Sequence, residues 1–321
     1  MMWKFEPILK TTIWGGDRIA VFKKISNTDT NIGESWELSG VEGSESIVSA
    51  GPDTGLTLTG LIDKYKSQLL GERNYTRFGH RFPLLIKFID AREDLSVQVH
   101  PDDEMAARLG HSCGKSEMWY VLQAPEGARL ANGFKTPVDP KDYDRLIETG
   151  EIEQVLNFNA ISPGDVYFIP AGRVHAIGKG AFVAEIQQTS DDTFRLYDYH
   201  RKGPDGKERE LHTELAREAI DFNDCSGKAT SYTVHENIPV NVVTSTFFTT
   251  NVLALDHEMM RDYSEADTFV AIVATGGSAE LVCGTQTTTI RQGETVLVSA
   301  DSNSLILRPL EKFTALETYI K

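Results

Sequence analysis

Cysteine is scarce in this chain of 321 residues. The three cysteines, Cys113, Cys225 and Cys283, are odd in number and widely spaced, and no two of them form a C-x-x-C pair. Scattered thiols of this kind do not make a disulfide framework, and they are typical of proteins that work in a reducing compartment.

Long hydrophobic runs are also missing. No run approaches the roughly 18 apolar residues that a transmembrane helix needs. The first seven residues, Met1 to Pro7, contain no apolar segment of the kind found in signal peptides. We therefore expect a cytoplasmic protein with no membrane partner.

Positive charge is the third shortage. The chain has 32 Lys and Arg residues against 47 Asp and Glu residues, which gives a formal net charge of −15. Such an acidic chain repels the phosphates of nucleic acids and anionic lipids, so neither is an expected partner. A small anionic substrate would need a local cluster of Lys and Arg.

What is present is enough apolar material for a core, with 40% hydrophobic and 25% charged residues. Short strand patterns with turn signals recur, and they predict a mainly β fold. Residues 56–78 and 139–157 have helical spacing instead, and we expect them to form helical insertions in the N-terminal part. From about residue 240 onward, short strands and glycine-rich turns predict a sandwich or jelly roll.

A weak internal repeat suggests how these strands are organised. Residues 164–171 and 293–300 both read as a glycine, an acid, an apolar-leaning stretch and an alanine. Repeats of this kind suggest two related β-barrels, one in each half. The length also favours two domains. We expect a catalytic domain over residues 1–235, in which the polar segment 199–235 leads to the second half, and a second barrel over residues 236–321.

Polar side chains line up on one predicted strand in the first half. Because side chains alternate along a strand, Ser96, Gln98 and His100 face one way and the two intervening valines face the other. Lys115 and Glu117 share a face of the next strand. His175 follows the strand of the first repeat.

Two histidines and one carboxylate on neighbouring strands predict a metal site, and an amide oxygen of Gln98 could complete it. A single histidine is more often structural than a ligand, but polar faces set against apolar backs favour ligation here. The other six histidines are interpreted as structural or surface residues: His80, His111, His200, His212, His235 and His257. The same ligand set also fits a two-His-one-carboxylate iron oxygenase.

Several segments in one order resemble successive motifs of the type I mannose-6-phosphate isomerases, in the short bacterial class of that family. These are residues 33–37 (GESWE), 82–87 (FPLLIK), 96–102 (SVQVHPD), 114–120 (GKSEMWY), 170–176 (PAGRVHA) and 193–198 (TFRLYD). The resemblance implies two cupin-like jelly-roll barrels, with one zinc ion per chain held by Gln98, His100, Glu117 and His175. It also implies an active-site role for Arg195. The second barrel has no histidine at the position that matches His175, and we expect it to bind no metal.

The implied reaction interconverts mannose 6-phosphate and fructose 6-phosphate through an enediol, so the expected partner is a small sugar phosphate. Lys87 and Lys115, with Ser96, are candidates for holding the phosphate. Glu185 is an acid in an apolar strand and is expected to contact substrate. Candidates for the base are Lys115, Glu185 and a hydroxide on the metal. A non-catalytic sugar-phosphate sensor on the same fold is a further alternative, and the sequence predicts no oligomeric state.

Overall fold

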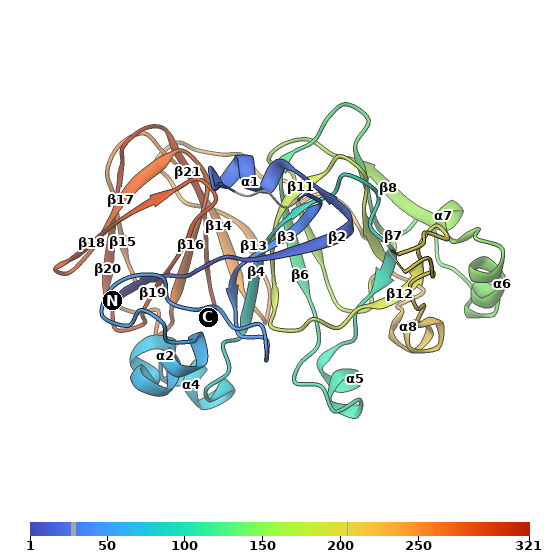
Figure 1. Ribbon diagram of the computed structural model, residues 1–321, viewed down its shortest axis with the longest axis horizontal. Coiled ribbons are helices and arrows are strands. Elements are labelled where there is room, and N and C mark those ends of the chain that lie inside the picture. The colour runs from blue at the N-terminus through green and yellow to red at the C-terminus, as the bar shows by residue number, and fades with distance from the viewer. Residues whose placement is uncertain (27–29, 204) are drawn as a thin grey trace.

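The computed structural model describes residues 1–26, 30–203 and 205–321. Its strands form four antiparallel sheets that stack as two side-by-side barrels (Figure 1). The mainly β, jelly-roll prediction is therefore confirmed.

The first barrel consists of a six-stranded sheet facing a five-stranded sheet. The six strands, in spatial order, are β2 (Ile8–Gly16), β3 (Ile32–Ser39), β4 (Leu84–Asp90), β11 (Phe182–Gln188), β6 (Glu117–Gln123) and β9 (Val166–Ile169). The five strands are β12 (Phe194–Tyr197), β5 (Val97–Val99), β10 (His175–Ile177), β7 (Arg129–Phe134) and β8 (Leu156–Ala160).

The second barrel repeats this plan with a six-stranded and a four-stranded sheet. The first contains β1 (Met2–Lys4), β19 (Thr295–Val298), β16 (Val270–Gly276), β21 (Phe313–Tyr319), β14 (Thr249–Leu255) and β13 (Val240–Thr244). The second contains β15 (Met259–Asp262), β20 (Ser304–Pro309), β17 (Ser278–Cys283) and β18 (Gln286–Arg291).

The repeat seen in the sequence corresponds to equivalent strands. In the first barrel the order runs β4-β11-β6-β9, and in the second it runs β14-β21-β16-β19. The repeat segments form β9 and β19, which therefore occupy matching places. Glu117 pairs with Ile169 of β9, and Val270 pairs with Val298 of β19. The second barrel thus has a valine where the first has the predicted metal-binding carboxylate.

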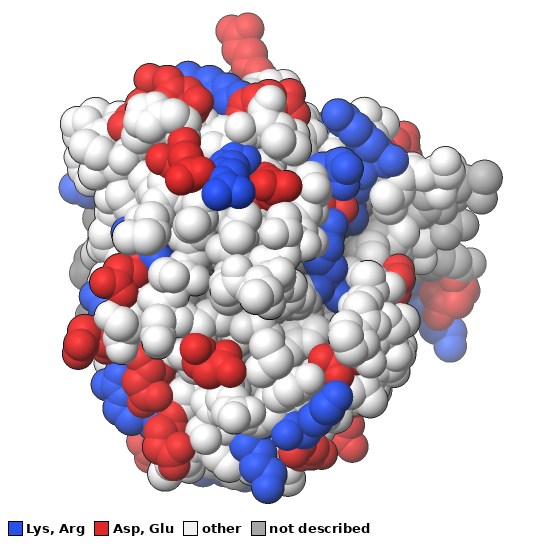
Figure 2. Space-filling view, turned by 90° about the vertical axis from the view of Figure 1, so that its left-hand side faces the viewer, with Lys and Arg blue, Asp and Glu red and all other residues white. Residues whose placement is uncertain are grey.

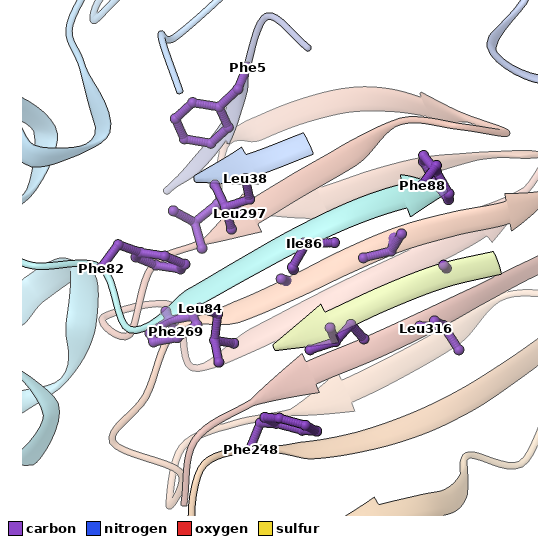
Figure 3. Close-up of a cluster of buried hydrophobic side chains, with 14 of the residues drawn as sticks. Phe5, Leu38, Phe82, Leu84, Ile86, Phe88, Phe248, Phe269, Leu297 and Leu316 are labelled. Carbon is purple, nitrogen blue, oxygen red and sulfur yellow. The ribbon is translucent and has the colours of Figure 1, made fainter. Parts of the chain in front are cut away.

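The two barrels share one core. Along β4, Leu84, Ile86 and Phe88 point away from the first barrel and pack against residues of the second, such as Phe269 and Leu316 (Figure 3). Phe82, just before β4, contacts Phe269 with ring centroids 4.7 Å apart. The division at residues 235 and 236 stays a prediction. In the structure the N-terminal strand β1 pairs with β19, so the two halves are also joined by a strand.

The predicted helical segments are helical, but they are broken into short pieces. Residues 56–78 form α2 (Leu58–Tyr65), α3 (Ser67–Leu70) and α4 (Glu72–Phe78). Residues 139–157 contain η1 (Pro140–Asp142), α6 (Tyr143–Glu148) and α7 (Ile152–Val155). The remaining helices are α1 (Arg18–Lys23), α5 (Asp103–Arg108) and α8 (Thr213–Ala219).

These helices cover apolar faces of the sheets. Helices α6 and α8 pack on the outside of the five-stranded sheet, where residues such as Tyr143 and Ala216 cover the outward-facing Val97 and Val99 of β5. Helix α5 begins after Asp102, whose side chain accepts a hydrogen bond from the Met105 amide at 2.8 Å. Packing on the outside fixes which side chains of β5 point into the barrel.

The surface carries both charges. On the end formed by the second barrel, acidic and basic side chains are interspersed, with no large field of one sign (Figure 2).

Among the described residues, no helix has both the length and the apolar character needed to cross a membrane.

The shared core makes a prediction about unfolding. We expect Phe269→Ala to lower the free energy of unfolding by about 3–5 kcal/mol, because the ring is fully buried between the barrels. Urea unfolding should remain a single transition by tryptophan fluorescence and by circular dichroism. The control Val21→Ala removes a side chain that is 77% exposed, and it should change stability by no more than about 0.5 kcal/mol. Two separate transitions, with only the second barrel weakened, would contradict a shared core.

Candidate metal and active site

The predicted metal ligands converge inside the first barrel. His175 on β10 lies directly opposite Gln98 on β5 in the five-stranded sheet. His100 follows β5, and Glu117 begins β6 in the facing sheet. Because the valines of β5 are buried on the outside, Gln98 and His100 point inward, as the alternation predicted.

His100, Glu117 and His175 form a compact cluster. Their ligand atoms all lie within 4.8 Å of one another. The Nε2 atoms of His100 and His175 are each 3.4 Å from a different oxygen of Glu117. The three residues are essentially inaccessible to solvent, at 1%, 0% and 0% exposure.

The side chains of two members of the cluster, His100 and Glu117, have no hydrogen-bond partner in the described part of the chain. Among the described residues, neither oxygen of Glu117 and neither ring nitrogen of His100 has a hydrogen-bond partner. A buried carboxylate without such partners is costly. Glu317, the buried carboxylate of the second barrel, is a useful contrast: it accepts four hydrogen bonds at 2.5–3.0 Å, from Arg261, Tyr263 and Asn251.

Burial keeps both imidazoles neutral, as metal ligands must be. Burial, followed by the nearby Lys115 ammonium, lowers the pKa of His100 to about 3. Burial also lowers the pKa of His175. The Nδ1 atom of neutral His175 donates a hydrogen bond to the Arg173 carbonyl oxygen at 2.8 Å, which leaves the lone pair on Nε2 facing Glu117.

Glu117 stays ionised in this setting. Burial by itself would raise the pKa of Glu117, but the Lys115 ammonium outweighs it and holds that pKa well below its usual range. The Lys115 Nζ atom is 3.5 Å from a Glu117 oxygen. Two neutral imidazoles and one carboxylate with free lone pairs fit a divalent metal such as zinc.

The place of Gln98 is compatible with a fourth ligand. Its Nε2 atom lies 3.2 Å from His175 Nε2, and its Oε1 atom lies 3.5 Å from the Ser96 hydroxyl. A half-turn of the amide group would exchange its oxygen and nitrogen. Ligation by Gln98 therefore stays a prediction.

A cavity of roughly 320 Å³ opens beside the cluster. The structure brings together all the other site residues predicted from the sequence, since each of them lines this cavity. They are Lys87, Ser96, Lys115, Glu185 and Arg195, together with Gln98. The wall also contains residues that the sequence analysis missed: Trp14, Glu34, Asp191, Thr193 and Arg209.

Lys87 and Glu185 are direct cross-strand neighbours on β4 and β11. The Lys87 Nζ atom lies 3.4 Å from Glu185 and 3.7 Å from Glu34. Burial would lower the pKa of Lys87, but these two carboxylates more than compensate and raise it. Burial, followed by the charge of Glu117, raises the pKa of Glu185. Trp119 Nε1 donates to one Glu185 oxygen at 3.0 Å, and the other oxygen, Oε1, has no hydrogen-bond partner among the described residues.

Arg195 lies opposite Gln98 across the β12–β5 pair, so the two side chains share the inner face of the barrel. Its Nη1 atom donates to the Glu210 carbonyl oxygen at 2.8 Å. Its Nε atom is buried and has no partner among the described residues. Burial and then the charge of Arg209 lower the pKa of Arg195, but a guanidinium remains protonated at any physiological pH.

The cavity residues that were not predicted differ in how clearly the sequence indicated them. Glu34 belongs to the GESWE motif, and an acid beside a buried lysine was a usable signal. Arg209 lies in the polar segment interpreted as a connection, where nothing distinguishes it from other surface arginines. The six remaining histidines are exposed or half-buried and lie outside the cluster, in accord with their interpretation.

Comparison with known proteins now adds to this geometry. Residues 2–157 match the model of the phosphomannose isomerase type I catalytic domain. The mannose-6-phosphate isomerase ManA of Bacillus subtilis is 37% identical over 243 residues, which cover 75% of this chain and 74% of that protein. The chain belongs to the type I phosphomannose isomerase family.

Other relatives agree along most of the chain. A mannose-6-phosphate isomerase of Streptococcus mutans is 30% identical over 89% of this chain and 88% of its own length. The crystal structure of the Bacillus subtilis mannose 6-phosphate isomerase superposes with a TM-score of 0.89 at 29% identity, over 99% of both chains. A zinc-bound mannose 6-phosphate isomerase shares the fold, with a TM-score of 0.80 at 18% identity over 100% of this chain and 99% of its own.

The cluster makes a prediction that does not depend on activity. His100→Ala should weaken zinc affinity by at least about a hundredfold, because it removes one of three converging donors. Metal content by mass spectrometry and competition with a chromogenic chelator would measure the change. His111→Ala is the matched control, because that histidine is exposed and pairs with Asp192. Equal zinc affinity in the two variants would argue against the cluster as the metal site.

Proposed function

We propose that this chain interconverts mannose 6-phosphate and fructose 6-phosphate through an enediol, with one zinc ion held by His100, Glu117 and His175 and a fourth ligand from Gln98. The observation that carries the proposal is the buried cluster of His100, Glu117 and His175, which lies next to residues of a cavity lined by cationic side chains. Membership of the family supplies the substrate.

Bound zinc would supply Lewis-acid polarisation of the sugar oxygens at carbons 1 and 2. Charge stabilisation and proton transfer are the roles of side chains of the protein. Negative charge develops on these oxygens when the proton leaves carbon 2. Arg195 lies on the strand next to that of Gln98, and its Nε atom, which has no partner among the described residues, can donate to that charge.

The proton itself must leave carbon 2 and arrive at carbon 1, and the hydroxyl proton moves in the same sense, from oxygen 2 to oxygen 1. Glu185 suits this transfer, because its Oε1 atom accepts no hydrogen bond from a described residue and burial raises its pKa. Its other oxygen is fixed by Trp119, which orients the carboxylate. Lys115 remains the second candidate, since it lines the same cavity.

Lys87, Lys115 and Ser96 complete the proposed substrate contacts. All three side chains are nearly buried, at 3–4% exposure, and all face the cavity. A sugar displaces water from such a site and meets oriented donors. The positive charge of the two lysines attracts an anionic sugar phosphate into the cavity.

The direct test is to incubate the zinc-loaded protein with mannose 6-phosphate and to follow fructose 6-phosphate in a coupled assay. We expect activity that is lost on chelation and restored by zinc. Binding without turnover would favour a sensor, and activity that requires iron instead of zinc would favour different chemistry.

Arg195 has its own prediction. Arg195→Ala should lower kcat by about 10²- to 10³-fold, because it removes a donor to the developing charge, while bound zinc stays stoichiometric. The matched control is Arg308→Gln, which removes an exposed arginine of the second barrel. Turnover at the normal rate in Arg195→Ala would show that its assigned role is wrong.

A further inference from the structure

Arg209 lies on the cavity wall with no role in the proposal above. It is 26% exposed, and it reaches the cavity from the segment after β12. We propose that Arg209, oriented by Asp198, binds the phosphate of the sugar phosphate at the outer end of the cavity. This inference rests on the proposed function and adds the residue that recognises the phosphate.

The length of the substrate separates its reacting carbons from its phosphate. The reacting carbons are 1 and 2, and the phosphate is on carbon 6, at the opposite end of the chain. If carbons 1 and 2 lie at the metal cluster, the phosphate must lie away from it. Lys115 contacts Glu117 and therefore belongs to the metal end. Lys87 is already flanked by Glu34 and Glu185.

Arg209 meets the requirement for the other end. It lines the same cavity as Thr193 and Arg195, and its side chain is partly open to solvent, whereas those of Lys87 and Lys115 are not. Arg195 donates to the carbonyl of Glu210, the residue next to Arg209, so the two guanidinium groups approach the same cavity from adjacent backbone. Two arginines side by side attract a dianion.

Asp198 fixes this arrangement. Arg209 donates to both of its oxygens, from Nε and Nη2, at 2.6 Å each. Asp198 is only 5% exposed, and it also pairs with Arg201, which donates to the carbonyl oxygen of Asp94. The carboxylate therefore ties the segment that carries Arg209 to the loop before β5. In this pairing the third nitrogen of Arg209, Nη1, makes no hydrogen bond to a described residue.

Asp198 is thus a positioning residue and Arg209 a binding residue. Burial would raise the pKa of Asp198, but hydrogen bonds from the two arginines lower it instead, so the carboxylate stays charged near neutral pH. The pairing leaves one guanidinium edge for a ligand. The paired N–H donors of a planar guanidinium match phosphate oxygens better than the point charge of a lysine does.

The test compares ligands that differ only in the phosphate. Calorimetry would measure binding of mannitol 6-phosphate, which has no carbonyl and cannot be isomerised, and of mannitol. In the wild-type protein the phosphate should improve affinity strongly. Arg209→Gln should reduce this gain roughly ten- to a hundredfold and leave mannitol binding unchanged. Arg209→Lys keeps the charge but loses the paired donors, and it should give an intermediate value.

Steady-state kinetics provides the second readout. Arg209→Gln and Asp198→Asn should raise the KM for mannose 6-phosphate by roughly tenfold or more, with a much smaller change in kcat. Zinc content and melting temperature identify a variant that has merely lost its fold. Arg308→Gln is the control, because its Nε–carboxylate distance of 2.6 Å equals that of Arg209 but it lies in the second barrel.

The outcomes separate the two proposals. If the phosphate contributes as much to binding in Arg209→Gln and Arg209→Lys as in the wild type, Arg209 is not the phosphate residue, whatever the reaction. If the wild type binds mannitol 6-phosphate through Arg209 but does not turn over mannose 6-phosphate, the proposed isomerase function fails and the phosphate site stands.

Discussion

A carboxylate buried at 0% exposure without a hydrogen bond is the constraint on which the active region depends. Removing such a charge from water costs several kcal/mol, and contacts with neutral imidazoles do not offset this cost. Lys115 supplies one opposing charge at 3.5 Å. A divalent cation among the three donors would supply the rest. Without such a cation the buried charge of Glu117 would destabilise the fold, which supports its proposed role as a metal ligand.

Such a cluster works only if the strands that hold it cannot move, and the shared core provides this rigidity. Each key residue of the six-stranded sheet has immediate neighbours that are buried between the barrels. Glu117 is followed by Met118, Lys87 lies between Ile86 and Phe88, and Glu185 lies between Ala184 and Ile186. The second barrel therefore closes the back of the active-site sheet. Since close-packed interiors resist displacement, this packing holds the polar faces in register.

The part of the site that sequence could predict is the part carried by strand alternation. Val97 and Val99 predicted that one face of their strand is apolar and packs outside the barrel. Because side chains alternate, Gln98 and His100 were therefore expected to face inward. His175 was added because it follows a neighbouring strand, and the family motifs then added Arg195, which no local pattern placed near the others. Two structural features could not be predicted from the sequence. The helical segment 56–78 breaks at Lys66 and Gly71, both with positive φ, and at Gly71 the carbonyl oxygen of Asp267 leaves no room for a side chain. Arg209 depends on a contact with Asp198 that only the folded segment creates.

The charge of the cavity explains how an acidic chain can hold an anion. Four cationic side chains line it, Lys87, Lys115, Arg195 and Arg209, against the carboxylates of Glu34, Glu185 and Asp191. The buried lysines are compensated by carboxylates within 3.4–3.7 Å, because an unpaired charge at their depth would be costly. The arginines are more open to solvent and keep donor groups free. Attraction for a dianion is therefore greater beside the arginines than beside the lysines, whose charge is balanced by carboxylates. If Arg209 binds the phosphate as proposed, the reacting carbons of the substrate lie beside the metal ligands and its doubly charged end lies beside the arginines.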